Sequence, residues 1–182
     1  MKHSRITAMA ALWGLAFWGS HTAAQSARGA VIPVQLIGAW THTEWQMGHG
    51  HFDPDRVDQM NSRNQDPVGW RDAYRFFPDG SYQHVHFKSL DIPGCDVKTL
   101  RQELGWLRLS ADSVRLESRT AKLSAQDRCH RQNNFEGRAD KPSEPRTLHW
   151  RLGQNRNGQT VLLLKDADGR ETAYNRDPSG HI

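Results

Sequence analysis

The sequence predicts an all-β chain that folds as a single antiparallel, up-and-down barrel of about eight strands. Three observations support this fold class. Short runs rich in aromatic and β-branched residues recur along the chain, and turn signals of the Pro-Asp-Gly and Asn-Gly kinds separate them. No convincing helical period is seen beyond the N-terminal stretch. Strands joined one after another by hairpins most often close into a barrel.

The N-terminal stretch has the pattern of a signal peptide. Lys2 and Arg5 precede an apolar run over residues 6–18, and small residues follow as far as Ala24. The apolar run is too short for a membrane-spanning helix, which needs about 20 residues. We therefore interpret residues 1–24 as a signal peptide and residues 25–182 as one exported barrel domain, periplasmic or secreted. A retained N-terminal anchor is the alternative.

Charge and length limit the classes of function. The formal net charge of the 182-residue chain is +4, and loss of the two N-terminal cations reduces it to +2. The remaining arginines alternate with acidic residues along the expected strands, so nucleic-acid binding is not indicated. A mature chain of about 158 residues suits one domain with a core of its own. No membrane span is expected in it, and the sequence does not set its oligomeric state.

The first expected strand covers residues 37–46 and carries the first polar residues of a possible site. Its tryptophan, Trp40, is a large apolar side chain that suits the barrel interior. Side chains of a strand alternate between its two faces, so an inward Trp40 also directs His42 and Glu44 inward. Residues 47–69 follow without any periodicity and include His49 and His51. A loop of this length is usually functional or disordered.

The next stretch, residues 70–89, predicts a β-hairpin. Pro78-Asp79-Gly80 supplies its turn, because proline fits the first turn position and glycine the positive φ. We expect the cross-strand pairs Phe76 with Tyr82, Tyr74 with His84, Asp72 with His86, and Trp70 with Lys88. Four aromatic residues on this face identify it as the inner face, which also places Asp72, His84 and His86 inside the protein.

The rest of the chain predicts strands over residues 97–109, 114–123, 146–152, 161–165 and 171–176. Residues 90–96 and 124–145 are expected to be irregular. The connections after strands one, three and five would then be long and would gather at one open end of the barrel. Cys95 and Cys129 lie in two of these connections and are expected to form a disulfide, as an oxidising compartment allows. They form no CxxC motif, so redox catalysis is not indicated.

Several short motifs resemble bacterial secreted lipocalin-like (calycin) proteins. Gly38-Ala39-Trp40 is similar to the G-x-W of that family, and residues 74–82, YRFFPDGSY, resemble its Y-x-F-x-PDG-x-Y hairpin. Asp168-Gly169 and Tyr174-Asn175-Arg176 are similar to its closing strand. The resemblance implies a barrel with a binding site at its open end, and an arginine, here Arg176, that can stack over the tryptophan of the first strand.

The inward polar and aromatic residues form a candidate site at the open end. The expected ligand-binding residues are His42, Glu44, Trp70, Asp72, Tyr74, His84 and His86. Imidazoles with carboxylates suit a divalent transition metal such as Zn²⁺. The expected metal ligands are His42, His84, His86, Asp72 and Glu44, with His49 and His51 closing from the loop. Two other interpretations remain open: a structural Asp72–His86 pair, and acid/base catalysis by these groups.

We therefore expect an exported, lipocalin-like protein that binds a small polar ligand or a divalent metal at the open end of its barrel. One alternative is a barrel enzyme that uses the interior histidines and carboxylates. Another is an envelope module that binds a protein partner through its long loops. No catalytic residue is assigned, because Ser-His-Asp spacing and phosphate-binding loops are absent from the sequence.

Overall fold

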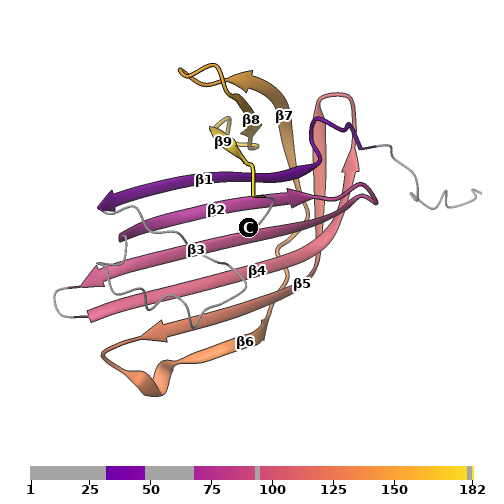
Figure 1. Cartoon of the computed structure of the whole chain (residues 1–182). Helices are drawn as coiled ribbons and strands as arrows, with labels where there is room; N and C mark the ends of the chain where they lie inside the picture. Colours follow the sequence, from indigo (N-terminus) through magenta and orange to yellow (C-terminus); the bar gives the residue numbers. More distant parts are fainter. Residues whose placement is uncertain (1–31, 48–67, 93–94, 180–181) are drawn as a thin grey trace, which may run out of the picture.

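The computed structural model describes residues 32–47, 68–92, 95–179 and 182 (Figure 1). Nine strands follow one another in these residues: β1 (Gly38–Met47), β2 (Val68–Phe76), β3 (Ser81–Ile92), β4 (Cys95–Leu109), β5 (Ser113–Asp127), β6 (Phe135–Asp140), β7 (Arg146–Gln154), β8 (Thr160–Lys165) and β9 (Glu171–Asp177). One turn of 3₁₀ helix, η2 (Arg131–Asn133), precedes β6. The expected signal peptide and most of the loop with His49 and His51 lie outside the described residues.

Eight of the strands form a ring of antiparallel neighbours. The order β4-β3-β2-β1-β9-β8-β7-β5 returns to β4 through the pairing of β4 with β5, and β6 pairs with the far part of β5. The predicted all-β antiparallel barrel is thereby confirmed. No helix in the described part of the chain is both long enough and apolar enough to cross a membrane.

The ring is closed tightly at one end and diverges toward the other. Only three residue pairs join β1 to β9, from Ala39–Asp177 to Thr41–Asn175, and only residues 113–116 of β5 pair with β7. Beyond these points β1 to β6 continue as a long curved sheet, while β7, β8 and β9 fold back over one end of it (Figure 1). The side chains of β1, β2 and β3 that lie beyond the ends of these pairings therefore face an opening.

The central hairpin has the predicted register. Trp70, Asp72, Tyr74 and Phe76 pair with Lys88, His86, His84 and Tyr82, respectively. The loop closes through a hydrogen bond from the Phe77 amide to the Ser81 carbonyl, 3.0 Å, and Gly80 takes the positive φ of 84° that the turn requires. The turn fixes the register, and the register decides which side chains enter the barrel.

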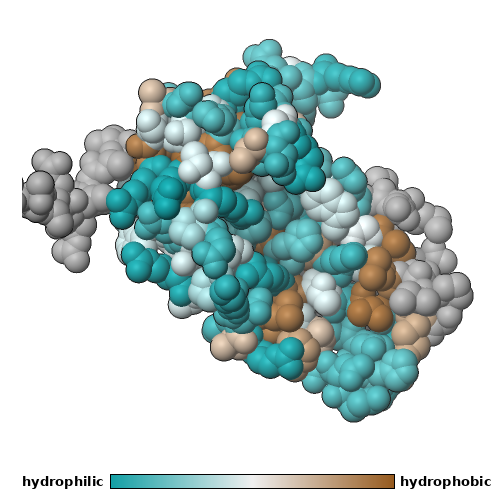
Figure 2. Space-filling model, turned by 180° about the vertical axis from the view of Figure 1, so that it is seen from behind, coloured by the Kyte–Doolittle hydropathy of each residue, from teal (hydrophilic) through white to brown (hydrophobic). Residues whose placement is uncertain are grey.

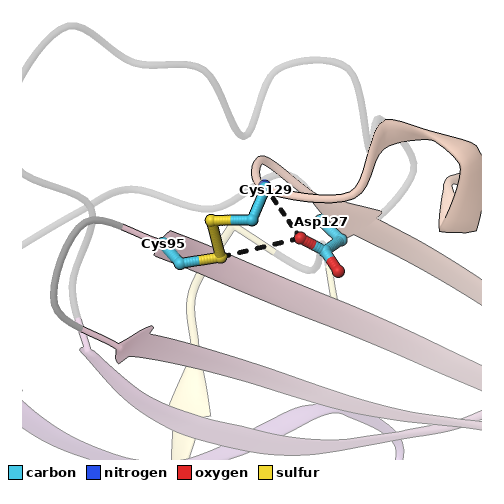
Figure 3. Close-up of side chains that lie close together, drawn as sticks. All are labelled: Cys95, Asp127 and Cys129. Atoms are coloured by element: carbon cyan, nitrogen blue, oxygen red, sulfur yellow. Dashed lines mark hydrogen bonds between the residues drawn. A yellow bond between two sulfur atoms is a disulfide. The ribbon is translucent and has the colours of Figure 1, made fainter.

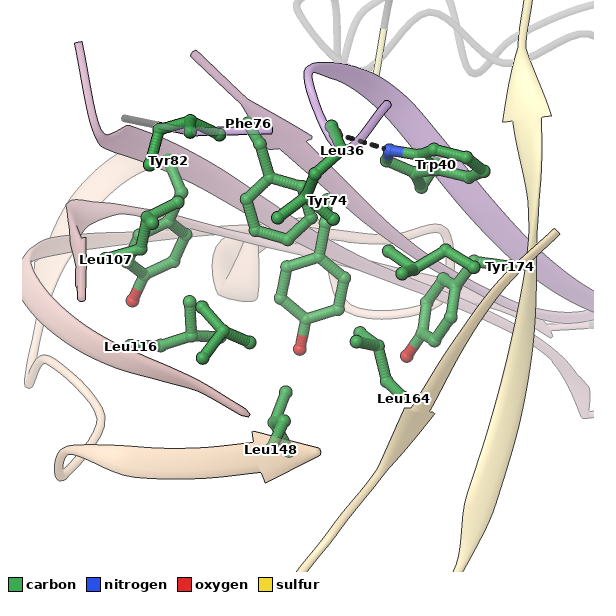
Figure 4. Close-up of a cluster of buried hydrophobic side chains, with 13 residues drawn as sticks. Leu36, Trp40, Tyr74, Phe76, Tyr82, Leu107, Leu116, Leu148, Leu164 and Tyr174 are labelled. Atoms are coloured by element: carbon green, nitrogen blue, oxygen red, sulfur yellow. Dashed lines mark hydrogen bonds between the residues drawn. The ribbon is translucent and has the colours of Figure 1, made fainter. Parts of the chain in front are cut away.

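A hydrophobic core fills the closed end of the barrel. Its members include Trp40, Tyr74, Phe76, Tyr82, Leu116, Leu148, Leu164 and Tyr174 (Figure 4). Trp40 is fully buried and donates a 2.8 Å hydrogen bond from Nε1 to the Leu36 carbonyl. The guanidinium of Arg176 lies 4.9 Å from the Trp40 ring centroid. The expected stacking of this arginine on the tryptophan is confirmed, and it joins β9 to β1.

Two further features of the sheet were not evident in the sequence. A second apolar cluster covers its outer face and consists of Ala39, Ala73, Val85, Phe87, Leu100 and Ile182.

At Gly105 the ladder between β4 and β5 contains an irregularity, and a Cβ at this position would collide with the Glu117 carbonyl and lie 2.8 Å from a ring carbon of Tyr82. Seen from behind, the surface is mainly hydrophilic, with separate apolar patches (Figure 2).

The prediction of irregular structure is wrong for residues 90–92 and 95–96, and within residues 124–145 it is wrong for 124–127 and 135–140, which are strands. Residues 128–134 and 141–145 lie outside strands, as predicted. β3 and β4 are paired almost to their connection at residues 93–94, β5 continues to Asp127, and β6 follows. These segments are polar and mostly lack the alternation that marks a half-buried strand, but backbone hydrogen bonds to a neighbouring strand suffice to hold them. The connection between β3 and β4 is therefore short. The Cys95–Cys129 disulfide is confirmed, with 5.5 Å between the Cα atoms.

Candidate functional site

A cavity of about 590 Å³ lies where the barrel opens, between β1–β3 on one side and β7–β9 on the other. Two walls line the cavity. Polar and aromatic side chains of β1, β2 and β3 form one wall, and residues of β7, β8, β9 and the β8–β9 turn form the other. The lining residues are His42, Glu44, Trp70, Asp72, Tyr74, His86, Arg146, Leu148, Leu164, Asp166, Arg170, Glu171, Thr172, Ala173 and Tyr174.

Asp72 is the centre of a hydrogen-bonded group at the base of the cavity. Its Oδ1 accepts hydrogen bonds from His84 Nε2, at 2.7 Å, and from His86 Nδ1, at 3.3 Å. Its Oδ2 accepts one from the hydroxyl of Tyr174 at 2.7 Å. Burial alone would raise the pKa of this carboxyl, but the hydrogen bonds from His84 and His86 outweigh it and hold the pKa well below its ordinary value of 3.8. Asp72 is therefore ionised.

His84 is a neutral imidazole. It is buried against the face of Tyr74, with 4.4 Å between the ring centroids, and burial lowers its pKa below 6.5 although Asp72 opposes the change. With the proton on Nε2 donated to Asp72, Nδ1 accepts a hydrogen bond of 3.2 Å from the guanidinium of Arg146. This tautomer satisfies both ring nitrogens at once.

Tyr74 and Tyr174 complete the buried floor of the cavity. Burial raises the pKa of both phenols, so both remain protonated at neutral pH. Their rings meet edge to face at 5.4 Å between centroids. The Tyr174 hydroxyl is thus available as the donor that Asp72 requires.

A second polar group behind the cavity positions Arg146. Glu103, whose side chain is 1% exposed, forms an ion pair with Arg101. Arg101 also donates to Asp140 Oδ2 at 2.9 Å and to the Lys141 carbonyl at 2.8 Å. These contacts fix the segment between β6 and β7, and Arg146 is the first residue of β7.

Trp70 forms an aromatic wall near the opening. Its ring centroid lies 4.9 Å from that of His42 and 6.1 Å from that of His86. His42 contacts the Ala173 carbonyl through Nδ1 at 2.8 Å, beyond the point where the pairing of β1 with β9 ends. Its Nε2 lies 3.5 Å from Glu44 Oε1, and Glu44 is 64% exposed at the rim.

The structure brings most of the sequence-predicted site residues together. His42, Glu44, Trp70, Asp72, Tyr74 and His86 line the cavity, and His84 lies behind them as a partner of Asp72. The sequence reasoning missed Arg146 and Tyr174. Arg146 lies two positions before Leu148 on the inward face of its strand, so strand periodicity could have identified it. Tyr174 has Thr172 and Arg176 as its neighbours on the same face, so no apolar alternation marked it.

No three of the expected metal ligands converge in the described residues. The one group of three potential ligands with close donor atoms there is Cys95, Asp127 and Cys129 (Figure 3). Its cysteines form a disulfide, and Asp127 accepts hydrogen bonds from the amides of Cys129 and His130. These contacts stabilise the loop after β5. His84 and His86 contact the same oxygen of Asp72. Metal binding by the interior histidines stays a prediction, and His49 and His51 lie outside the described residues.

No protein-family model matches the chain, and a search of curated proteins finds no match either. The lipocalin-like resemblance of its motifs therefore stays a prediction, whereas the antiparallel barrel itself is established by the strand pairing.

Proposed function

We propose that this protein is an exported, lipocalin-like binding protein that takes a small polar ligand into the open end of its barrel. The observation that carries the proposal is the 590 Å³ cavity, into which polar side chains from five strands converge. Sites for small molecules are usually concave, between about 300 and 1,000 Å³, with a few placed polar groups on a largely apolar wall. The Cys95–Cys129 disulfide supports export to an oxidising compartment.

The polar group around Asp72, at the floor of the cavity, favours ligand binding over a purely structural role. Burying Asp72 with its three donors has a large desolvation cost, and an apolar cluster of the same volume would often be equally stable or more so. The arrangement instead provides a rigid polar surface, because every donor that faces Asp72 is already held in place. Such preorganisation reduces the entropy lost on binding.

The same groups give less support to an enzyme. The hydroxyls among the lining residues belong to Thr172 and the two tyrosines, and burial raises the pKa of both phenols away from the range of a base or nucleophile. Asp72 is ionised and fully engaged by donors. Binding therefore requires fewer changes to the observed site than catalysis does.

A ligand screen with a blocked cavity tests the proposal. The mature protein, with its disulfide intact, is screened against a library of small polar metabolites and Zn²⁺ by thermal shift and native mass spectrometry. A ligand present at 100 times its Kd stabilises the folded state by about 2.7 kcal/mol, which is measurable as a rise in Tm. Thr172→Phe fills the cavity and abolishes the rise, whereas Thr147→Phe, on the exposed face of β7, leaves it unchanged.

Three results decide between these readings of the cavity. Failure of every compound to bind, or equal binding by Thr172→Phe and wild type, would refute a ligand site in this cavity. Stoichiometric zinc that is lost in His86→Ala would instead identify the ligand as a divalent metal, as the sequence also suggests.

A further inference from the structure

Arg146 differs from the other charged residues that line the cavity. It begins β7 with its side chain partly buried, and its guanidinium donates hydrogen bonds to the neutral Nδ1 of His84, at 3.2 Å, and to the protonated phenol of Tyr74. Its Cζ also lies 5.6 Å from the ring centroid of Tyr74. Neither contact supplies a negative charge.

The acidic residues of the cavity are all engaged by other groups. Asp72 accepts from two histidines and a tyrosine, Asp166 pairs with Arg170, Glu171 pairs with Arg151, and Glu44 lies near His42. Behind the cavity, Glu103 pairs with Arg101 through Oε1, and its Oε2 lies 3.9 Å from Nδ1 of His84. Within the described part of the chain, no carboxylate is left within ion-pair distance of Arg146.

An unpaired guanidinium in this position has capacity for a ligand. Arginine remains charged at any ordinary pH and carries five N–H donors in a planar fork, which matches the two oxygens of a carboxylate. A partly buried charge is costly unless it is paired. Arg146 lines the cavity, and its two hydrogen-bond partners, His84 and Tyr74, are both neutral, so an anion from solution can supply the missing charge.

We infer that the ligand is a small organic monocarboxylate whose carboxylate group binds Arg146. The inference rests on the proposed function and names the class of ligand. Leu148, Leu164 and the Trp70 ring line the same cavity as Arg146 and suit an apolar or planar body. A dianion such as a phosphate monoester fits less well, because the same lining holds ionised Asp72 and three further acids against two arginines.

The test compares molecules that share a body and differ in the head group. Indole-3-acetate, indole-3-acetamide and tryptamine form one set, and hexanoate, hexanamide and hexylamine form another. Each is titrated calorimetrically into the mature wild-type protein, Arg146→Gln, Arg146→Lys and the control Arg115→Gln, which removes an exposed arginine from the outer face of β5. Far-UV circular dichroism and the intact disulfide show that each variant is folded.

We expect at least one carboxylate to bind more tightly than its amide and its amine. Arg146→Gln weakens that carboxylate roughly 10- to 100-fold, the usual value of a hydrogen bond to a charged group, and removes its advantage over the amide. Arg146→Lys keeps the charge and retains the advantage, and Arg115→Gln binds as wild type does.

Other results overturn the inference in distinguishable ways. Preferred binding of an amine or amide, or a carboxylate affinity that is unchanged in Arg146→Gln, refutes the assignment of ligand class but leaves the cavity as a binding site. If none of the six probes binds and the metabolite hits lack a carboxylate, the assignment is refuted as well. If neither the probes nor the library bind, the proposed function fails together with it.

Discussion

Replacing Asp72 by Asn removes the charge at the centre of the buried group while keeping its shape. Asp72 accepts three hydrogen bonds, and its side chain is only 14% exposed. The amide of Asn keeps one oxygen and presents an NH₂ group where the other oxygen stood, so at least one donor loses its acceptor. Hydrogen bonds to a charged group contribute about 1.5 to 3 kcal/mol and neutral ones about 1 kcal/mol. We expect Asp72→Asn to reduce the free energy of unfolding by about 2 to 4 kcal/mol.

Urea unfolding of the mature protein measures this loss, and Asp112→Asn is the matched control, because Asp112 is 77% exposed. For a domain of this size the loss corresponds to a decrease in Tm of about 5 to 15 °C. The dependence on pH gives a second check. The folded-state pKa of Asp72 is depressed, so its contribution is fully present above pH 3.8 and is lost as the pH falls toward the folded-state value. The difference between wild type and Asp72→Asn therefore narrows below that pH.

Equal stability of Asp72→Asn and Asp112→Asn at pH 7 would refute this reasoning. So would a difference that stays constant from pH 7 to pH 3, because Asp72 would then not be a depressed, ionised carboxylate in the folded protein.

Three further predictions concern the disulfide, Gly105 and His84. Replacing Cys95 and Cys129 by serine opens a loop with a sequence separation of 34 and costs about 4 kcal/mol in the chain-entropy model. Urea titration measures this loss against the oxidised wild type, and the reduced wild type is expected to show the same loss. Gly105→Ala forces a methyl group against the Glu117 carbonyl, and we expect a loss of about 3 kcal/mol by thermal unfolding. The pKa of His84 is lowered on folding, so wild-type stability declines as the pH falls below 6.5, and His84→Gln flattens that decline between pH 6.5 and pH 5.

Much of the site was predictable because one turn sets its register. Once Pro78-Asp79-Gly80 closes a hairpin, period-two alternation places Asp72 opposite His86 without further information. The same alternation on β1, starting from Trp40, brings His42 to the neighbouring position. These are local rules, and they hold within a hairpin and its adjacent strand.

The missing parts of the site depend on contacts between residues distant in sequence. Tyr174 reaches Asp72 because β9 pairs with β1, and Arg146 reaches His84 because β7 pairs with the start of β5. Neither pairing is specified by a turn. β6 was missed for another reason: its residues are almost all exposed, so no apolar alternation marks it as a strand.

The most direct test of the proposed site is to observe which side chains respond when a carboxylate binds. Indole-3-acetate is titrated into ¹⁵N-labelled mature protein, and the N–H resonances of the Trp70 indole and the Arg146 guanidinium are followed by NMR, with Trp106 on the outer face of β4 as the internal control. If the ligand occupies the cavity as proposed, the Trp70 and Arg146 resonances shift in a saturable way and Trp106 does not. Shifts centred on Trp106, or saturable binding without a change at Arg146, would contradict it.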